Sequence, residues 1–262
     1  MESTIPCRLS LVYNPASDRA VVLRRGPSRW TRMISWDLNA DLFEFGQWLH
    51  GTVPANDCDI TPNGKYISCY VSSHKKRKPY FWVSVSKPPY FSALSTWLIS
   101  AQGGRCYFNS NNELNITPGI YPEEFSLMEG YNSGPLKVTS IYQDNVPKLK
   151  RNGWHFIVPV DYPSNYSLEL LERLKPSPLN PNLILKCIKK TYQLTIHKKT
   201  LVLVDIVDID WDKRGHLFGV SSTGNACRII INDKHEININ NIYNFNDMMP
   251  EDILPTNESL TW

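Results

Sequence analysis

The sequence lacks the long apolar runs that a membrane-spanning helix requires. Such a helix needs roughly 20 consecutive apolar residues, whereas the apolar run from Leu201 to Val204 already ends at Asp205. The segment from Met1 to Cys7 has neither the basic start nor the apolar core of a signal peptide. We therefore expect a soluble, cytoplasmic protein that does not contact a membrane.

Closely spaced metal ligands are also missing. The six cysteines are scattered without a CxxC pair, which predicts free thiols in a reducing compartment. A zinc site needs about four Cys or His ligands at short spacings, but Cys58 and Cys69 have no H-x3-H pair nearby. We expect neither a metal nor a cofactor.

Motifs for catalysis are absent in the same way. There is no G-x-S-x-G sequence that would present a nucleophile on a sharp turn, and the six histidines occur in unrelated contexts. The turn Gly26-Pro27-Ser28 precedes a strand and lacks the spacing of a phosphate-binding loop. These absences favour a protein that is not an enzyme.

What is present is a regular succession of strand and turn signals. In the stretch from Cys58 to Val71, Pro62-Asn63-Gly64 predicts a tight turn, because proline presets its backbone angle and Asn-Gly adopts positive φ. Beyond the turn, Tyr66, Ser68 and Tyr70 are expected on one face of a strand, and Ile67, Cys69 and Val71 on the other. Similar strands recur roughly every ten residues, which favours a sandwich, barrel or propeller.

Two pairs of segments indicate internal repetition. Residues 36–43 and 211–218 both read W-D, four variable residues, L-F, and Asp59 precedes Gly64 by the same spacing with which Asp210 precedes Gly215. Each copy is a strand, a polar turn and an apolar strand. We therefore expect a mainly β protein built as an antiparallel meander, as an irregular β-propeller of about five blades.

The middle and the end of the chain are less regular. Short helices are expected at residues 142–151 and, unless that segment is a long loop, at residues 166–174, before Pro176. The Asn-rich stretch 238–249 is not expected to form a tidy strand. We expect one domain over residues 1–262, with an acidic tail from residue 232 to 262 that is packed on it or partly mobile.

Charge is distributed unevenly, although the net charge is only +3. Residues 1–33 contain six arginines and two acids, whereas residues 232–262 contain six acids and one lysine. Either the two ends neutralise each other in the folded protein, or they form separate partner surfaces. The tail acids considered for such a surface are Asp247, Glu251 and Asp252.

The strongest candidate for a binding site is the arginine-rich segment before and within the third expected strand. Guanidinium groups and an indole occur there on a turn, a combination that suits an anionic partner. The alternative is that Arg24 and Arg25 pair with acids such as Asp37, Glu44 or Asp59. The candidate partner- or anion-binding residues are Arg24, Arg25, Arg29, Trp30 and Arg32.

A second basic segment lies beside three aromatic residues, Tyr80, Phe81 and Trp82. Basic and stacking groups together can bind nucleic acid, but the low net charge speaks against that function, and basic hairpin tips are usually solvated loops that discourage edge pairing. Phe81 and Trp82 must point to opposite faces of their strand, so at least one belongs to the core. The basic residues are Lys75, Lys76, Arg77 and Lys78.

Four segments of the chain stand out together: residues 23–32, 46–48, 58–64 and 86–90. In these segments, and less closely at 151–154 and 210–212, the chain resembles an uncharacterised family of bacterial proteins without a known activity. The turn from Asp59 to Tyr66 also resembles the blade turn of WD40-like propellers, which specifies architecture rather than function. The glycine-rich run expected after the Pro-Pro-Tyr segment is reduced here to Gly103-Gly104-Arg105.

Together these features predict a non-catalytic protein-binding protein of a bacterial cell, such as an immunity protein that neutralises a cognate toxin. Charge complementarity is a common basis for such rapid capture. One alternative is a hydrolase with a site in a propeller channel near Arg24, Arg29, Asp37 and Asp59. A second is a nucleic-acid-binding module that uses the basic segment 74–78.

Overall fold

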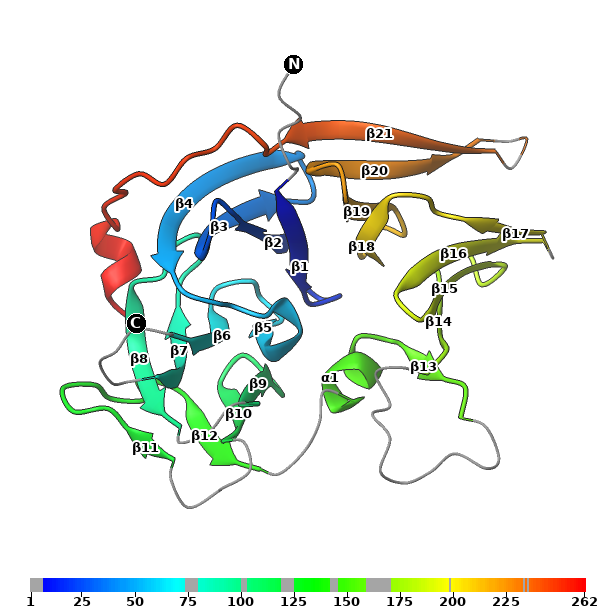
Figure 1. Ribbon diagram of the computed structural model, residues 1–262. Helices are drawn as coiled ribbons and strands as arrows, with labels where there is room; N and C mark the ends of the chain where they lie inside the picture. Colours follow the sequence, from blue (N-terminus) through cyan, green and yellow to red (C-terminus); the bar gives the residue numbers. More distant parts are fainter. Residues whose placement is uncertain are drawn as a thin grey trace. The chain divides into compact units, whose positions relative to one another are not determined.

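The protein is mainly β, with antiparallel sheets in meander order, as the sequence predicts (Figure 1). The computed structural model describes residues 7–73, 80–99, 103–118, 125–141, 146–158, 171–197, 199–232, 234 and 236–262. The chain forms two compact units: a larger unit of Ser10–Asn145 with Met248–Trp262, and a smaller unit of Met1–Leu9 with Val146–Asp247. The expectation of one domain stays a prediction.

The sheets of the larger unit follow the chain almost in order. The first is β1 (Arg8–Tyr13), β2 (Arg19–Arg25), β3 (Trp30–Asp37) and β4 (Leu42–His50). The second runs β11 (Ser126–Leu127), β8 (Ala93–Leu98), β7 (Phe81–Ser86), β6 (Ile67–Ser72) and β5 (Cys58–Ile60). The third is β12 (Lys137–Ser140), β10 (Glu113–Thr117) and β9 (Arg105–Phe108), in which β10 and β12 pair in parallel.

The hairpin predicted around Pro62-Asn63-Gly64 is confirmed. Strands β5 and β6 pair antiparallel with Cys58 opposite Cys69, and Gly64 has a φ of +70°. The two predicted faces of β6 enter different cores. Tyr66 and Tyr70 pack in one apolar cluster, while Ile67, Cys69 and Val71 pack in another. The sheet is therefore buried on both sides.

The smaller unit contains two described sheets and one α-helix, α1 (Val146–Arg151). One sheet is β13 (His155–Phe156), β14 (Arg173–Pro176), β15 (Leu183–Ile188), β16 (Thr191–Ile196) and β17 (Lys199–Val202). The other is β18 (Ile206–Trp211), β19 (Leu217–Ser221), β20 (Asn225–Ile231) and β21 (Ile237–Asn244). Both contribute to one core, in which Leu185 and Leu194 join Ile209 and Trp211.

The segments that match in sequence form corresponding hairpins. Gly64 donates its N–H to Thr61 at 2.8 Å, and Gly215, with a φ of +72°, donates to Asp212 at 2.9 Å. The W-D…L-F segments differ by one residue in register, because Trp36 lies opposite Phe43 but Trp211 lies opposite Leu217.

Two expectations about irregular segments are wrong. Ile237–Asn244 forms strand β21, because its backbone pairs with β20 whatever its side chains prefer, although the register shifts at a bulge between Asn241 and Tyr243. Leu174, expected in a helix or a long loop, lies in β14, where it pairs with Lys186 of β15. The remainder of that predicted segment, residues 166–170, lies outside the described residues. Phe245, the residue after β21, is fully buried.

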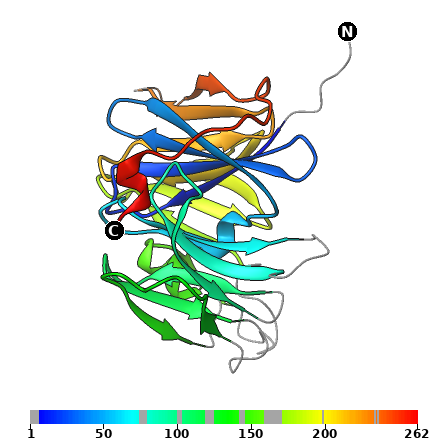
Figure 2. The ribbon, with the colours of Figure 1, turned by 90° about the vertical axis from the view of Figure 1, so that its left-hand side faces the viewer.

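The C-terminal segment of the larger unit runs along the first sheet and ends in a 3-10 helix, Asn257–Leu260 (Figures 1 and 2). Gln47 of β4 donates to the Ile253 carbonyl at 3.0 Å, and Lys87 donates to the Glu258 carbonyl at 2.6 Å. The Trp262 ring lies 5.5 Å from that of Tyr66. These contacts hold the chain end against the larger unit.

All six cysteines are free and buried. Burial raises the pKa of the Cys227 thiol to about 12. Among the described helices, none has the length and apolar character to cross a bilayer.

Candidate functional site

The arginine-rich candidate residues lie at the β2–β3 hairpin. Arg24 lies opposite Arg32, and Arg25 lies opposite Thr31. Because side chains alternate along a strand, Arg24 and Arg32 share one face of the sheet while Arg25 points to the other. Burial further divides the predicted cluster into a buried set, Arg24 and Arg32, and an accessible set at the turn.

The first set is buried and structural. Arg24 and Arg32 are 3% and 6% exposed, and their guanidinium carbons lie 5.2 and 5.4 Å from the centre of the Trp48 ring. Arg24 donates to the Gly26 carbonyl, and Arg32 Nε donates to the Gly46 carbonyl at 3.1 Å. These cation–π contacts and hydrogen bonds hold the hairpin ends together.

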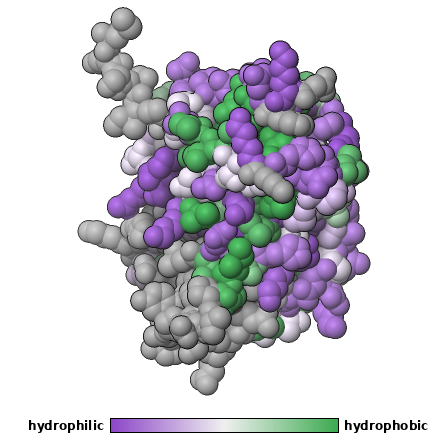
Figure 3. Space-filling view, turned by 90° about the vertical axis from the view of Figure 1, so that its right-hand side faces the viewer, coloured by the Kyte–Doolittle hydropathy of each residue, from purple (hydrophilic) through white to green (hydrophobic). Residues whose placement is uncertain are grey.

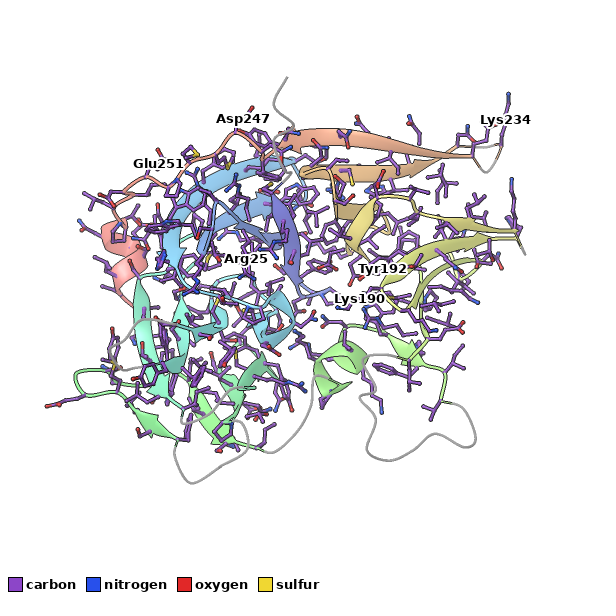
Figure 4. All side chains as sticks on the ribbon, viewed as in Figure 1. Arg25, Lys190, Tyr192, Lys234, Asp247 and Glu251 are labelled. Atoms are coloured by element: carbon purple, nitrogen blue, oxygen red, sulfur yellow. The ribbon has the colours of Figure 1, made fainter. Side chains whose placement is uncertain are left out.

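The buried Arg32 also forms an ion pair with the acidic tail. Its Nη2 atom lies 2.8 Å from Glu251 Oε1, and the Glu251 side chain is 59% exposed. Glu251 lies on the C-terminal segment, away from Arg25 (Figure 4). An ion pair of this kind is expected if the basic N-terminal segment and the acidic tail neutralise each other in the folded protein. The other tail candidates, Asp247 and Asp252, are exposed.

The second set forms an accessible turn. Arg29 is exposed, and Arg25 and Trp30 are partly buried. The Trp30 ring meets that of the exposed His50 edge-on at 5.0 Å. Gly26, whose φ of +124° favours glycine, donates to the Trp30 carbonyl at 2.9 Å. The exposed Arg29 therefore lies on a fixed turn next to the Trp30–His50 ring pair, which shares the sheet face of Arg32, whereas Arg25 points to the opposite face.

Sequence reasoning missed two members of this site, Trp48 and His50. The sequence signal that could have identified them is the alternation along β4, which places Trp48 and His50 on one face. In the sheet, Trp48 pairs with Arg32 and His50 pairs with Trp30. Only the correct register between β3 and β4 reveals these partners.

Two of the acids considered beside the arginines, Asp37 and Asp59, accept backbone N–H groups. Asp37 lies opposite Arg19, five residues along β2 from Arg24, which corresponds to about 17 Å. Its carboxylate accepts the N–H groups of Asn39 and Ala40 in the following turn. Asp59, 1% exposed, accepts the Phe108 N–H at 2.7 Å. The four residues named for a hydrolase site therefore do not meet in one place.

The basic residues Lys75, Lys76, Arg77 and Lys78 lie outside the described residues. Of the neighbouring aromatics, Phe81 packs against one core cluster of the larger unit and Trp82 against the other, which confirms that they face opposite sides. Tyr80 is 40% exposed.

A polar cluster in the smaller unit was not anticipated. The buried Lys175 forms an ion pair with Asp210, and the Trp154 ring lies 5.0 Å from the Arg173 guanidinium and 5.9 Å from Lys175 Nζ. Arg173 and Lys175 alternate along β14, a pattern hidden by the helical interpretation of this segment. The cluster is enclosed in the unit's core, which indicates a stabilising role.

Tyr192 continues this cluster towards β18 (Figure 4). Its hydroxyl donates to Asp208 Oδ1 at 3.3 Å. Burial raises the pKa of Tyr192 well above its usual value, and the Asp208 charge acts in the same direction. Burial lowers the pKa of Arg173, but nearby Tyr192 and Cys187 more than offset this effect, so its pKa is raised. The phenol therefore stays neutral and the guanidinium stays charged.

Apolar side chains also reach the surface of the smaller unit. Val202, Val204 and Val207 are 55%, 67% and 41% exposed. On the side of the molecule seen in Figure 3, apolar patches are interrupted by polar side chains. Scattered exposure of this kind is ordinary for a protein surface. Among the described residues, no group of three His, Cys, Asp or Glu side chains is arranged to hold a metal ion.

No family model matches the chain, and no curated protein matches it. Among solved structures, the chain is similar to the uncharacterized protein lmo1340 from Listeria monocytogenes EGD-e. The two are 11% identical with a TM-score of 0.34, over 95% of this chain and 86% of that one. At this level the similarity carries no conclusion about fold or function.

Proposed function

We propose that this protein is a non-catalytic protein-binding protein, and that the accessible set at the β2–β3 turn contacts its partner. The observation that carries the proposal is the exposed Arg29 next to Trp30 on one backbone-fixed turn, where the Trp30 ring meets that of the exposed His50 of β4. Tryptophan and arginine are the residues most enriched among those that dominate binding energy at protein interfaces.

The chemistry of the turn favours an acidic partner surface. The exposed guanidinium group of Arg29 suits carboxylates, because arginine binds them in a planar, bidentate manner. The buried pair Arg24 and Arg32 supports this surface from below by fixing the ends of the two strands. A fixed site loses less conformational entropy on binding than a mobile one.

Capture of a partner by the full chain tests this proposal. We expect the wild-type protein to retain a stoichiometric protein from its native host, and R29A/W30A to lose it, with an affinity at least about 30-fold weaker, because such hot-spot changes cost about 2 kcal/mol or more. Arg8→Ala is the matched control, since Arg8 is an exposed arginine at the start of β1. Equal capture by R29A/W30A and wild type would show that the turn is not the binding site.

Toxin neutralisation is the more specific form of this proposal. It requires that the captured partner damages cells and that the purified chain abolishes this activity at a 1:1 ratio. A harmless partner would contradict the immunity function and leave the binding function intact.

We further propose that the sheets are blades of an irregular propeller. Support comes from the five described sheets and from the corresponding turns at Gly64 and Gly215. A single closed propeller of 262 residues should have a radius of gyration of about 18 Å. Small-angle X-ray scattering measures this value, and a clearly larger radius would indicate two separately tumbling units.

A further inference from the structure

A pocket of about 270 Å³ opens in the larger unit, over the second sheet. Its wall contains three aromatic residues: Trp82 of β7, Phe91 before β8, and Tyr131 after β11. Leu49 of β4 and Val71 of β6 add aliphatic surface. None of the lining residues carries a charge, so an ionic ligand would be desolvated there without a counter-charge.

Two hydroxyl groups interrupt the apolar wall. Ser84 of β7 and Thr96 of β8 lie directly opposite each other in the sheet and both line the pocket. They are 6% and 5% exposed, yet neither hydroxyl hydrogen-bonds to any described residue. Their oxygen atoms are not sealed from solvent, unlike that of the neighbouring Ser95.

Buried polar groups are normally hydrogen-bonded, so this adjacent pair offers two hydrogen-bonding positions to water or to a ligand that enters the pocket. Each hydroxyl is able to donate and to accept. A ligand group that also donates and accepts hydrogen bonds, such as a phenolic hydroxyl, would form hydrogen bonds with both side chains at once.

The size of the pocket is compatible with an aromatic ring and one substituent. A cavity of about 150 Å³ already holds benzene, and this pocket is larger. The segment at its rim is anchored, because Met128 donates its N–H to the Thr96 carbonyl at 2.9 Å and Tyr131 donates to the Met128 carbonyl at 3.1 Å. The pocket is therefore largely preformed, as small-molecule sites usually are.

We propose that this pocket binds a neutral phenolic ring, whose hydroxyl group bonds to Ser84 and Thr96 while the ring packs against Trp82 and Phe91. The ring belongs either to a small phenol or to a tyrosine side chain of another protein. This site lies on elements other than the β2–β3 turn and does not depend on the function proposed for it.

Titration of the full-length protein with p-cresol and with toluene tests the proposal. The readout is the ¹³C-methyl resonance of Met128, one of five methionines and a pocket-lining residue. We expect p-cresol to shift this resonance and to bind about fivefold more tightly than toluene, because its hydroxyl gains hydrogen bonds in the pocket. Absence of a shift, or equal affinity for the two compounds, would overturn the proposal.

Substitutions of Ser84 and Thr96 test whether the preference for p-cresol over toluene depends on their hydroxyl groups. In S84A/T96V the preference for p-cresol should disappear while toluene still binds. Ser95→Ala is the matched control and should keep the preference, because Ser95 points to the other face of β8 and its oxygen is sealed. Ala93→Leu, which fills the pocket, should abolish binding of both compounds without loss of the β-sheet circular dichroism. A preference that survives in S84A/T96V would overturn the assigned hydrogen bonds.

A capped Ala-Tyr-Ala peptide distinguishes the two sources of the ring. Tighter binding of the peptide than of p-cresol would identify a tyrosine side chain of a partner protein. Weaker binding of the peptide than of p-cresol would identify a small phenol, because the mouth of the pocket would then exclude the peptide backbone. Either result supports a phenol site, provided that S84A/T96V weakens it.

Discussion

Replacing Gly46 by alanine is expected to lower the free energy of unfolding by about 3 kcal/mol, the upper range for overpacking a well-packed core. Gly46 is buried in β4, and a Cβ atom on it would lie 1.8 Å from the Pro89 carbonyl oxygen. This neighbour is a backbone atom that cannot rotate away, and it accepts the Gln47 N–H at 3.2 Å. The added methyl group must therefore separate β4 from the segment around Pro89.

Denaturant unfolding monitored by tryptophan fluorescence measures this loss, which corresponds to a Tm about 6 to 12 °C lower. Gly51→Ala is the control. Its Cβ would have its nearest contact at 3.4 Å, an ordinary van der Waals distance, so we expect a change within about 0.5 kcal/mol. If the two variants were equally stable, the close approach of Pro89 to β4 would be wrong.

The close packing at Gly46 brings together two of the sequence segments noted above. The segments 46–48 and 86–90, which both contribute to the resemblance to bacterial proteins, contact each other here. Gln47 Oε1 accepts the N–H groups of Phe91 and Ser92 at 2.8 and 3.0 Å. The two segments therefore pack against each other and are held together by the hydrogen bonds of Gln47.

Replacing Lys175 by methionine is expected to cost about 3 to 5 kcal/mol, because it leaves the Asp210 carboxylate without its buried counter-charge. The side chains of Lys175 and Asp210 are 7% and 12% exposed. Asp210 also accepts the Trp211 N–H at 2.6 Å. Urea denaturation followed by circular dichroism would report the loss.

The double variant K175M/D210N separates the charge from the packing. The amide removes the unpaired charge and keeps an acceptor for Trp211, so most of the stability should return. The control is Lys186→Met in the same sheet. Lys186 pairs with Glu172 at 3.2 Å, but both side chains are about 30% exposed, and such a pair contributes about 1 kcal/mol or less. Equal losses in K175M and K186M would contradict the role of burial.

Local sequence patterns were sufficient where a turn and an alternation coincide. The hairpin from Cys58 to Val71, its two faces and the repeated turn at Gly215 follow from positive-φ glycines and period-two alternation, which act over a few residues. Patterns failed where pairing with a distant strand decided the structure. Thus the Asn-rich β21 and the leucine-containing β14 are strands because β20 and β15 satisfy their backbones.

At the candidate site, too, local patterns identified the residues, but pairing between strands decided their roles. The sequence identified the arginines and Trp30, but the register between β2, β3 and β4 decided that Arg24 and Arg32 are buried against Trp48 while Arg29 stays exposed. The Ser84–Thr96 pair has no sequence signature, since serine and threonine are common in strands and only a pocket makes them notable.

The sequence by itself thus determined the class of the protein: strand lengths, turns and alternation produce a mainly β meander, because these preferences act between near neighbours in the chain. Tertiary structure decided what each charged or hydroxyl side chain does. Burial and cross-strand pairing set whether a guanidinium group supports the sheet or meets solvent, and they depend on residues that are far away in the sequence.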